Sequence, residues 1–393
     1  MDWNPENGSH PNGSKGNGSH PDGAKSNGAK SNGSKANGAR RNGSRRPRQG
    51  IRHVLVIGGA GYVGSVLVRK LLDRGYGVTV MDALMYGDHG IRDLHGHPRF
   101  EVVEGDLRSV ESVVRATLGA DAVVHLGALV GDPACALDEK LTMEINLGAT
   151  RTVVEVARGL AVKRLVFAST CGVYGADDGL LSEESPLNPV SLYSRTKMES
   201  ERVVLAMSGP EFLPVVLRFG TFYGASPRPR FDLVVNLLVA RAVAEGEITI
   251  FGGDQWRPFV HVDDGAEAII RCLDAPPDLV RGRVFNVGSD DQNHTLGQIA
   301  NHIAELVPGV RVLYEGGRGA AEANYRVSFA RIRTQLGFVP HRSLAEGLTE
   351  IRDAIEQGAV ADYAEERYSN YKVLTRKGDM LRRSDSLSAS VGR

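Results

Sequence analysis

Short apolar runs alternate with longer segments of mixed polarity between residues 51 and about 357. The apolar runs are rich in Val, Leu and Ile and fall near 53–57, 78–82, 100–104, 121–126, 163–169 and 213–219. Runs of this length predict buried strands, and the segments between them are long enough for helices. Strands that alternate with helices build a parallel sheet with helices on both faces. We therefore expect a doubly wound α/β fold, with functional residues at the carboxyl ends of the strands.

Both ends of the chain have a different character. Asn-Gly-Ser and Asn-Gly-Ala units recur from Asn7 to Ser44 with almost no apolar residue, and the stretch 40–48 is basic. Such a segment cannot bury enough apolar surface to offset its ordering entropy, so residues 1–50 are predicted to form a disordered basic tail. The tail has no apolar h-region and is not predicted to be a secretory signal. Residues 376–393 are also predicted to be disordered.

A glycine-rich turn directly follows the first apolar run. Gly58, Gly61 and Gly64 stand three residues apart, and an amphipathic run from Val63 to Leu72 follows. Glycines at this spacing permit a tight turn and a close approach of the backbone to a diphosphate at the helix N-terminus. Asp82 ends the second apolar run, and its carboxylate suits a free ribose hydroxyl but repels a 2′-phosphate. This pattern predicts a Rossmann-type fold that binds NAD rather than NADP.

A second motif, Tyr193-x-x-x-Lys197, lies about 130 residues downstream, within a stretch (189–207) that is predicted to be helical. The spacing of four places both side chains on one helix face. Tyrosine ionises near pH 10, and a neighbouring ammonium would lower the pKa of Tyr193 enough for it to act as a base. Such a pair is common on ordinary helices. Together with the glycine turn, however, it predicts an enzyme that transfers a hydride to a bound dinucleotide.

With these motifs the chain resembles the extended short-chain dehydrogenases/reductases of the nucleotide-sugar epimerase/dehydratase family, which includes UDP-glucose 4-epimerase. The resemblance covers residues 51 to about 357. The stretch from Asn146 to Thr150 is similar to the Asn-x-x-Gly-Thr helix that is typical of this family, with an alanine, Ala149, before the threonine. Further landmarks of the family are Gly105-Asp106-Leu107, His125-Leu126-Gly127-Ala128, Asn146-Leu147-Gly148, the loop from Ala168 to Gly175, and the segment from Trp256 to Asp263.

The resemblance implies the roles of the site residues. Tyr193 would be the catalytic base, Lys197 would bind the nicotinamide ribose, and Thr170 would bond to the sugar hydroxyl. The substrate-binding positions would be Cys171, Thr221, Arg230 and Arg257, with Arg257 on a phosphate. NAD would contact Gly58, Gly61, Tyr62, Val63, Gly64, Asp82, Asp106, Leu107, Leu126, Ala128 and Asn146, besides Tyr193 and Lys197.

The loop after Thr170 departs from the 4,6-dehydratases, in which it reads Thr-Asp-Glu. Here Cys171 and Gly172 follow, so the acid pair that moves protons at C5 and C6 is missing. Inversion at C4 needs no further acid, only room for a transient 4-keto sugar to turn over, and small residues provide that room. We therefore expect an NAD-dependent nucleotide-sugar epimerase that acts at C4.

Other functions stay open. A reactive Cys171 thiol would favour 5-epimerisation or 5,6-dehydration, although free cysteines are commonly buried and inert. Net 4-ketoreduction would need an exchangeable cofactor. A non-catalytic NAD-sensing protein would be expected to lose the tyrosine and lysine, which are present here. Two arginines, Arg228 and Arg230, lie near the expected substrate mouth, where they meet a phosphate or carboxylate or are simply solvated.

Composition narrows the setting. Among the 393 residues, 47 Lys and Arg balance 47 Asp and Glu, which does not suggest a nucleic-acid partner. No apolar run is long enough to cross a membrane, and three cysteines are too few for a disulfide framework, which fits a reducing cytoplasm. No metal site is predicted.

The expected organisation has two parts between the tails. An NAD-binding domain is expected over 51–220 and a mainly substrate-binding region over 221–357, with the stretch 284–288 returning to the sheet. The family resemblance further implies a homodimer that forms through the helices predicted over 141–158 and 189–207.

Overall fold

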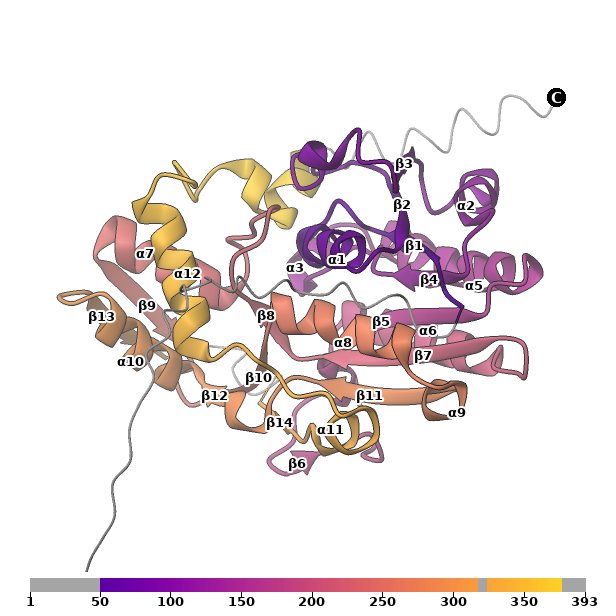
Figure 1. Cartoon of the computed structure of the whole chain (residues 1–393). Helices are drawn as coiled ribbons and strands as arrows, with labels where there is room; N and C mark the ends of the chain where they lie inside the picture. Colours follow the sequence, from indigo (N-terminus) through magenta and orange to yellow (C-terminus); the bar gives the residue numbers. More distant parts are fainter. Residues whose placement is uncertain (1–49, 317–323, 377–393) are drawn as a thin grey trace, which may run out of the picture. The chain divides into compact units, whose positions relative to one another are not determined.

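A seven-stranded parallel sheet forms the centre of the protein, whose computed structural model describes residues 50–316 and 324–376. The order of the strands is β11 (Arg283–Val287), β7 (Leu213–Phe219), β5 (Arg164–Thr170), β4 (Ala122–His125), β1 (His53–Ile57), β2 (Gly77–Asp82) and β3 (Phe100–Glu104) (Figure 1). The order reverses between β1 and β4, where a doubly wound sheet opens a crevice for a ligand. The predicted fold is confirmed, and the predicted strands are correct to within one residue.

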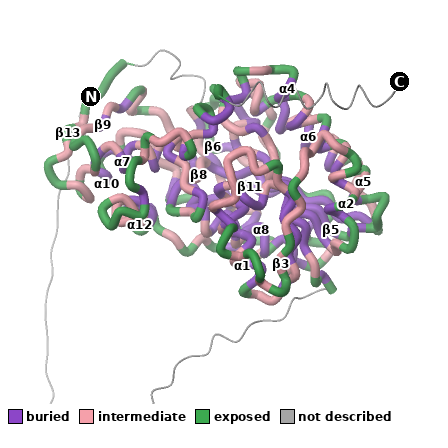
Figure 2. The backbone as a smooth tube through the Cα atoms, turned by 90° about the horizontal axis from the view of Figure 1, so that it is seen from above, coloured by how far each residue is buried: buried purple, intermediate pink, exposed green. Residues whose placement is uncertain are grey.

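Alternate side chains of each strand pack on opposite faces of the sheet. Val54 and Val56 share one apolar core with α1 (Tyr62–Asp73) and α8 (Val262–Asp274). Leu55 and Ile57 share another core with α2 (Val110–Thr117), α5 (Ala149–Gly159) and α6 (Leu192–Ala206). The strands therefore lie in a buried layer, purple in Figure 2, between two layers of helices whose outer sides are exposed.

The helix predicted over 141–158 contains a π-helical stretch. It consists of α4 (Glu139–Met143), the π-helical residues Glu144–Gly148, and α5. A π turn is a local widening of the helix that is frequent at functional sites, and here it directly precedes α5.

A second apolar core lies beyond the sheet. It is built by α7 (Val234–Glu245), β9 (Glu247–Phe251), α10 (Leu296–Leu306), β13 (Arg311–Glu315) and α12 (Leu344–Glu356). A three-stranded sheet of β12 (Asn293–Thr295), β10 (Trp256–His261) and β8 (Thr221–Tyr223) adjoins this core. The short elements are α3 (Asp132–Cys135), β6 (Leu180–Leu181), α9 (Pro277–Val280), β14 (Arg326–Val327) and α11 (Ala330–Leu336).

The last described residues fold back onto the sheet domain. The Tyr368 carbonyl accepts a hydrogen bond from Phe231 N at 2.9 Å, and Asn370 N donates to Asp232 at 2.8 Å. A helical stretch then runs from 370 to 376 and buries Leu374 against Leu129. This C-terminal segment, residues 365–376, thus connects the second core with the carboxyl end of the parallel sheet.

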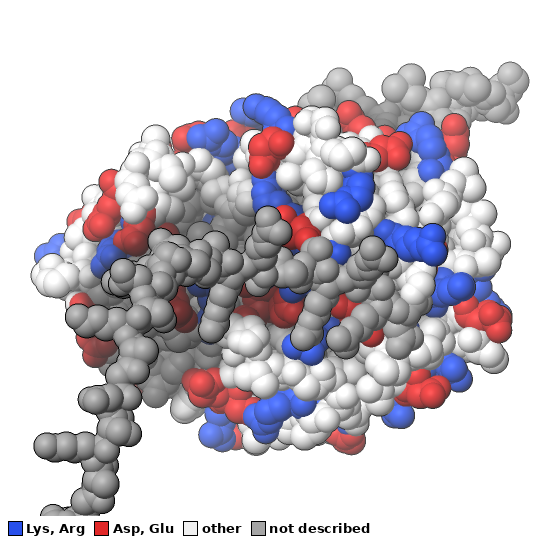
Figure 3. Space-filling view, in the orientation of Figure 1, with Lys and Arg blue, Asp and Glu red and all other residues white. Residues whose placement is uncertain are grey.

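The predicted disordered tails fall on residues 1–49 and 377–393, which lie outside the described part of the chain. Within the described ranges no helix is long and apolar enough to cross a membrane. On the face shown in Figure 3, lysines and arginines are interspersed with aspartates and glutamates.

Candidate active site

A pocket of about 530 Å³ opens at the carboxyl ends of the parallel strands. Its walls come from the glycine turn after β1, from the ends of β2, β4, β5 and β7, and from α6. Residues after 220, which belong mainly to the region around the second apolar core, complete the wall. Of the predicted site residues, the pocket is lined by Gly58, Gly61, Tyr62, Val63, Gly64, Asp82, Asp106, Leu107, Leu126, Ala128, Thr170, Tyr193, Lys197, Thr221, Arg230 and Arg257.

The glycine turn leaves no room for side chains. Gly58 has a φ of +78°, and a Cβ there would come within 2.8 Å of Gly127 N. A Cβ on Gly64 would come within 2.6 Å of Gly59 Cα. These close approaches let the start of α1 reach the strand ends, so its free N–H groups can face a diphosphate. The turn therefore fits the diphosphate of a dinucleotide.

Asp82 stands beside this turn at the end of β2. Its carboxylate accepts hydrogen bonds from Ala60 N at 3.0 Å and from Leu84 N at 2.9 Å, which fix its orientation. Burial raises its pKa above the ordinary value for aspartate, while the two backbone donors oppose that shift. A carboxylate at this position accepts hydrogen bonds from ribose hydroxyls, so the residues present fit NAD.

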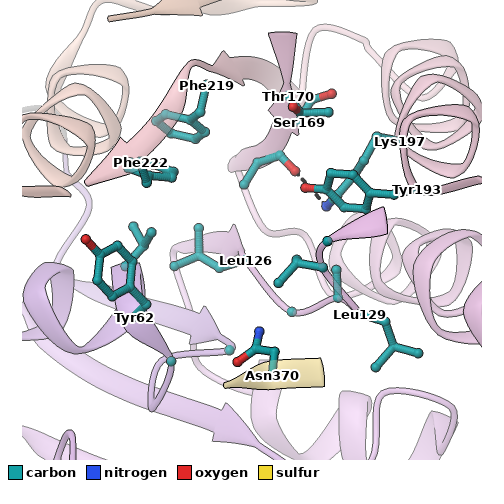
Figure 4. Close-up of a pocket in the computed structure, with 18 of the residues that line it drawn as sticks. Tyr62, Leu126, Leu129, Ser169, Thr170, Tyr193, Lys197, Phe219, Phe222 and Asn370 are labelled. Atoms are coloured by element: carbon teal, nitrogen blue, oxygen red, sulfur yellow. Dashed lines mark hydrogen bonds between the residues drawn. The ribbon is translucent and has the colours of Figure 1, made fainter. Parts of the chain in front are cut away.

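Thr170, Tyr193 and Lys197 line one wall of the pocket (Figure 4). Thr170 ends β5, where its Oγ1 accepts a hydrogen bond from Gly172 N at 3.1 Å. Lys197 Nζ donates to Ala168 O at 2.9 Å and lies 5.9 Å from the centroid of the Tyr193 ring. The two side chains share one face of α6, as their spacing predicts.

Burial dominates the protonation of this pair. It raises the pKa of Tyr193 above its ordinary value, and it lowers the pKa of Lys197 to about 8. The first shift is opposite to the one expected from a neighbouring ammonium: burial is its largest cause, and Lys197 Nζ donates its hydrogen bond to Ala168 instead of to Tyr193. Oxidised nicotinamide carries a positive charge, which would favour the phenolate when NAD is bound.

Two predicted site residues do not line the pocket. Cys171 is fully buried and its Sγ lies 3.2 Å from Arg218 O, while burial raises the pKa of its thiol. Its thiol therefore packs among other buried groups. Asn146 is also buried: its side-chain Oδ1 accepts from Leu129 N at 2.8 Å and its Nδ2 donates to Leu129 O at 3.0 Å. Asn146 thus positions the loop after β4.

The predicted substrate residues Thr221, Arg230 and Arg257 all line the pocket. Arg257 donates to Trp256 O at 2.9 Å and to Gln255 Oε1 at 2.7 Å, which hold its guanidinium in place. Arg230 pairs with Asp232 at 2.9 Å. Thr221 begins β8 beside them. Two guanidinium groups in one wall suit an anionic ligand such as a diphosphate.

Among the other residues that line this pocket, sequence reasoning assigned no role to Asp132, Tyr325 or Asn370, and it named Arg228 only as lying near the substrate mouth. The charge of Asp132 acts on Tyr193, Arg257 and Tyr325, which places this acid at the substrate end. The loop that carries it follows the family landmark at His125, which is the signal that could have identified it. Asn370 lies more than 130 residues from Arg228 and Asp232, so no local pattern connects it to the site.

Comparisons with known proteins agree with this geometry. The sequence profile of the NAD dependent epimerase/dehydratase family matches residues 54–288. A dTDP-glucose 4,6-dehydratase of Streptomyces griseus is 32% identical over 75% of this chain and 92% of its own length. A UDP-glucose 4-epimerase of Lactobacillus helveticus is 30% identical over 73% of this chain and 92% of its own.

A solved structure, MoeE5 in complex with UDP-glucuronic acid and NAD, superposes with a TM-score of 0.66 at 31% identity, over 76% of this chain and 97% of that one. The protein belongs to the NAD-dependent epimerase/dehydratase family. This membership confirms the predicted family and the predicted cofactor, NAD. The named relatives carry out different reactions, so the reaction of this chain has to be argued from its own site.

Proposed function

We propose that the protein is a nucleotide-sugar 4-epimerase that works through a transient 4-keto sugar. The observation that carries this proposal is the loop after β5, where Thr170 is followed by a buried Cys171 and by Gly172. This loop offers a hydroxyl to hold the substrate but no acid that could eliminate water. Gly172 lines the pocket without a side chain and so leaves room for the sugar to present its other face.

In the proposed reaction Tyr193 takes the proton of the C4 hydroxyl while the C4 hydride leaves the sugar. Thr170 holds that hydroxyl, and Lys197 holds the ribose of the cofactor and stabilises the phenolate. NAD, when bound, would supply the acceptor and donor for that hydride. After the keto sugar has turned over, Tyr193 gives its proton back to the C4 oxygen of the epimer. The sugar is thus neither oxidised nor reduced overall.

Arg257 and Arg230 are proposed to hold the diphosphate of the nucleotide sugar. Both line the pocket and present guanidinium groups, and Arg257 Cζ lies 5.9 Å from the centroid of the Tyr325 ring. Binding energy at the diphosphate can then anchor the substrate while the hexose turns. The structural relative MoeE5 has been solved in complex with a nucleotide sugar, UDP-glucuronic acid.

A second candidate reaction rests on Asp132. This acid shares the substrate end with Tyr193, and a carboxylate near C5 of a 4-keto sugar could exchange the acidified C5 proton. Such exchange would give 5-epimerisation or 5,6-dehydration, and one named relative is a 4,6-dehydratase. With Cys171 buried away from the pocket, Asp132 is the residue that would carry this alternative.

The test is incubation of the purified protein with UDP-, dTDP-, GDP- and CDP-sugars in D₂O, followed by NMR. We expect one of these sugars to invert at C4 without incorporation of deuterium. Deuterium at C5 or loss of water would instead support the Asp132 reaction, and Asp132→Asn should then abolish it. A protein that binds NAD but converts no nucleotide sugar would contradict both reactions.

We also propose a homodimer in the cytoplasm, with contacts through α5 and the outer side of α6. Met143 and Val190, which flank these helices, are 41% and 48% exposed, which leaves apolar surface for a partner copy. Light scattering behind a sizing column should give about twice the chain mass of 42.3 kDa. A mass equal to that of one chain would contradict the proposed dimer.

A further inference from the structure

A buried arginine stands in the cofactor half of the pocket. Arg228 is 1% exposed, and its Cζ lies 4.5 Å from the centroid of the Tyr86 ring. Burial lowers its pKa to about 10, so it is still a cation at neutral pH. The acid closest to it along the chain, Asp232, is paired with Arg230 instead. Within the described ranges Arg228 forms no ion pair, and its Nε has no hydrogen-bond partner.

Arg228 lies apart from Arg257, whereas the charge of Arg230 acts on it. It lines the same pocket as Asp82, and each charge acts on the other. A Cβ added to Gly90 would lie 2.9 Å from Arg228 Cβ and 3.0 Å from Ala60 O, so Arg228 also adjoins the glycine turn. The proposed substrate arginine, Arg257, instead interacts electrostatically with Tyr325 in the part of the pocket away from the glycine turn.

The cost of burying the Arg228 charge favours an anionic ligand beside its guanidinium. An isolated charge is costly to bury, and a buried cation is normally compensated by a counter-charge. Asp82 is committed to two backbone donors and faces the ribose position, so it does not form an ion pair with Arg228. The anion that this half of the pocket is built to admit is the diphosphate of the dinucleotide, which the glycine turn accommodates.

The C-terminal segment fixes the orientation of this guanidinium. Arg228 Nη2 donates to Asn370 Oδ1 at 2.7 Å, and Asn370 lines the pocket opposite Lys197 and Tyr193 (Figure 4). Asn370 is itself held by the hydrogen bond from its backbone N–H to Asp232. A neutral amide can orient the guanidinium without neutralising it, which leaves its charge for a ligand.

We propose that Arg228, oriented by Tyr86 and by Asn370 of the C-terminal segment, binds the diphosphate of NAD and makes this segment part of the cofactor site. Residues 365–376 lie outside the part of the chain that the family profile matches. The segment would then retain the cofactor between turnovers, as an enzyme that returns the hydride to the same substrate requires. The proposal rests on the cofactor and not on the choice of sugar reaction.

The test is isothermal titration calorimetry of the cofactor-stripped protein with NAD and with ADP-ribose. Arg228→Met keeps an unbranched apolar side chain but removes the charge, and we expect it to weaken both ligands about 10- to 100-fold. Asn370→Asp places a carboxylate beside the guanidinium and supplies the missing counter-charge. It should therefore also weaken NAD, yet raise the midpoint of thermal unfolding of the cofactor-free protein.

A matched control is Arg164→Met. Arg164 is 2% exposed and donates to backbone carbonyls, among them Ala275 O at 3.0 Å, at the start of β5 and away from the pocket. This variant should unfold at a lower temperature but, where it folds, bind NAD as the wild type does. A general loss of stability is thereby separated from a loss of cofactor affinity.

Binding of UDP and dTDP by Arg228→Met completes the test. We expect it to be unchanged, because Arg228 lies in the cofactor half of the pocket. Folded Arg228→Met and Asn370→Asp proteins that bind NAD like the wild type would overturn the proposal. So would a loss of UDP or dTDP binding with NAD binding intact, which would assign Arg228 to the substrate. If Arg228→Met does not fold, the NAD affinity of the Asn370→Asp variant tests the proposal by itself.

Discussion

Tyr193 and Lys197 share one wall of a buried pocket, and burial shifts their pKa values in opposite directions. The tyrosine is held in its neutral form and the lysine is close to losing its proton at neutral pH. A tyrosine that acts as a base in such a place depends on a nearby positive charge. The chemistry of the site is therefore poised to begin only when the oxidised cofactor is bound.

Replacement of Tyr193 by phenylalanine removes the one hydroxyl that can take the C4 proton. General base catalysis contributes about 10²- to 10⁴-fold, so turnover should fall by about 10³-fold or more. The content of bound NAD should not change, because the ring remains in the pocket wall. Turnover and NAD content, measured on the same preparation, check this; a rate within a few-fold of wild type would contradict the assigned role.

Replacement of Lys197 by methionine should change how stability depends on pH. The pKa of Lys197 is lowered by burial from 10.5 to about 8 in the folded protein. Between these values the unfolded chain binds the proton and the folded protein does not, so the wild type gains stability as pH rises from about 8 to 10.5. Below pH 8 the buried charge lowers stability.

Lys197→Met should lack this contribution. Urea unfolding at pH 7 and at pH 10 should show that the stability of the variant relative to wild type falls as pH rises. Arg202→Met, at an exposed position of the same helix, serves as the control and should show no such dependence. An equal difference between variant and wild type at both pH values would contradict the lowered pKa.

The residues that sequence reasoning placed correctly in the pocket wall are those set by local spacing. Glycines three apart and a tyrosine four residues before a lysine fix their own geometry, whichever partner they meet. Cys171 does not line the pocket, because side-chain direction at the end of a strand depends on the local 3₁₀ turn, where its thiol points to Arg218 O. Asn146 does not line it either, because its partner, Leu129, lies in a different element.

At the scale of elements, a buried ion pair ties α6 to the sheet. Arg218 of β7 donates to Glu201 of α6 through Nη2 at 2.7 Å and Nε at 3.0 Å, and both side chains are almost fully buried. Glu201 also accepts a hydrogen bond from Ser169. The pair therefore fixes the helix that carries Tyr193 against β7, and the Ser169 hydrogen bond fixes it against β5, which ends at Thr170.

Arg218→Met should leave the Glu201 carboxylate buried without a counter-charge and lower the free energy of unfolding by about 3–5 kcal/mol. Glu201→Gln with Arg218→Met removes both charges and should recover part of that loss. Urea unfolding of the two variants measures the difference. If the single and double variants were equally stable, the ion pair would not be what connects these elements.

The strands were predictable because each is a buried apolar run whose length and period leave little choice. The π-helical stretch at Glu144–Gly148 was not predicted, because a helical pattern does not show where the turn widens. The packing of the C-terminal segment was not predicted, because residues 365–376 show no regular spacing of apolar residues that would indicate which elements they contact. Its contacts with Phe231 and Leu129 join parts of the chain more than 100 residues apart.

At the scale of the whole molecule, the pocket joins three parts of the chain with separate tasks. The parallel sheet and its glycine turn form the proposed cofactor end, and the region after residue 220 contributes Arg230 and Arg257 to the pocket wall. The C-terminal segment contributes Asn370 between them. An epimerase needs this arrangement, because the cofactor has to remain in place while the sugar moves.

The fate of the C4 hydrogen tests the proposed epimerase most directly. A nucleotide sugar that carries deuterium at C4 is converted in ordinary water, and NMR locates the label in the product. The proposed mechanism predicts that the label stays at C4 of the inverted sugar, because the hydride is given to bound NAD and returned to the same carbon. A label found at C6 of a dehydrated sugar, or C4 inversion with loss of the label to solvent, would contradict it.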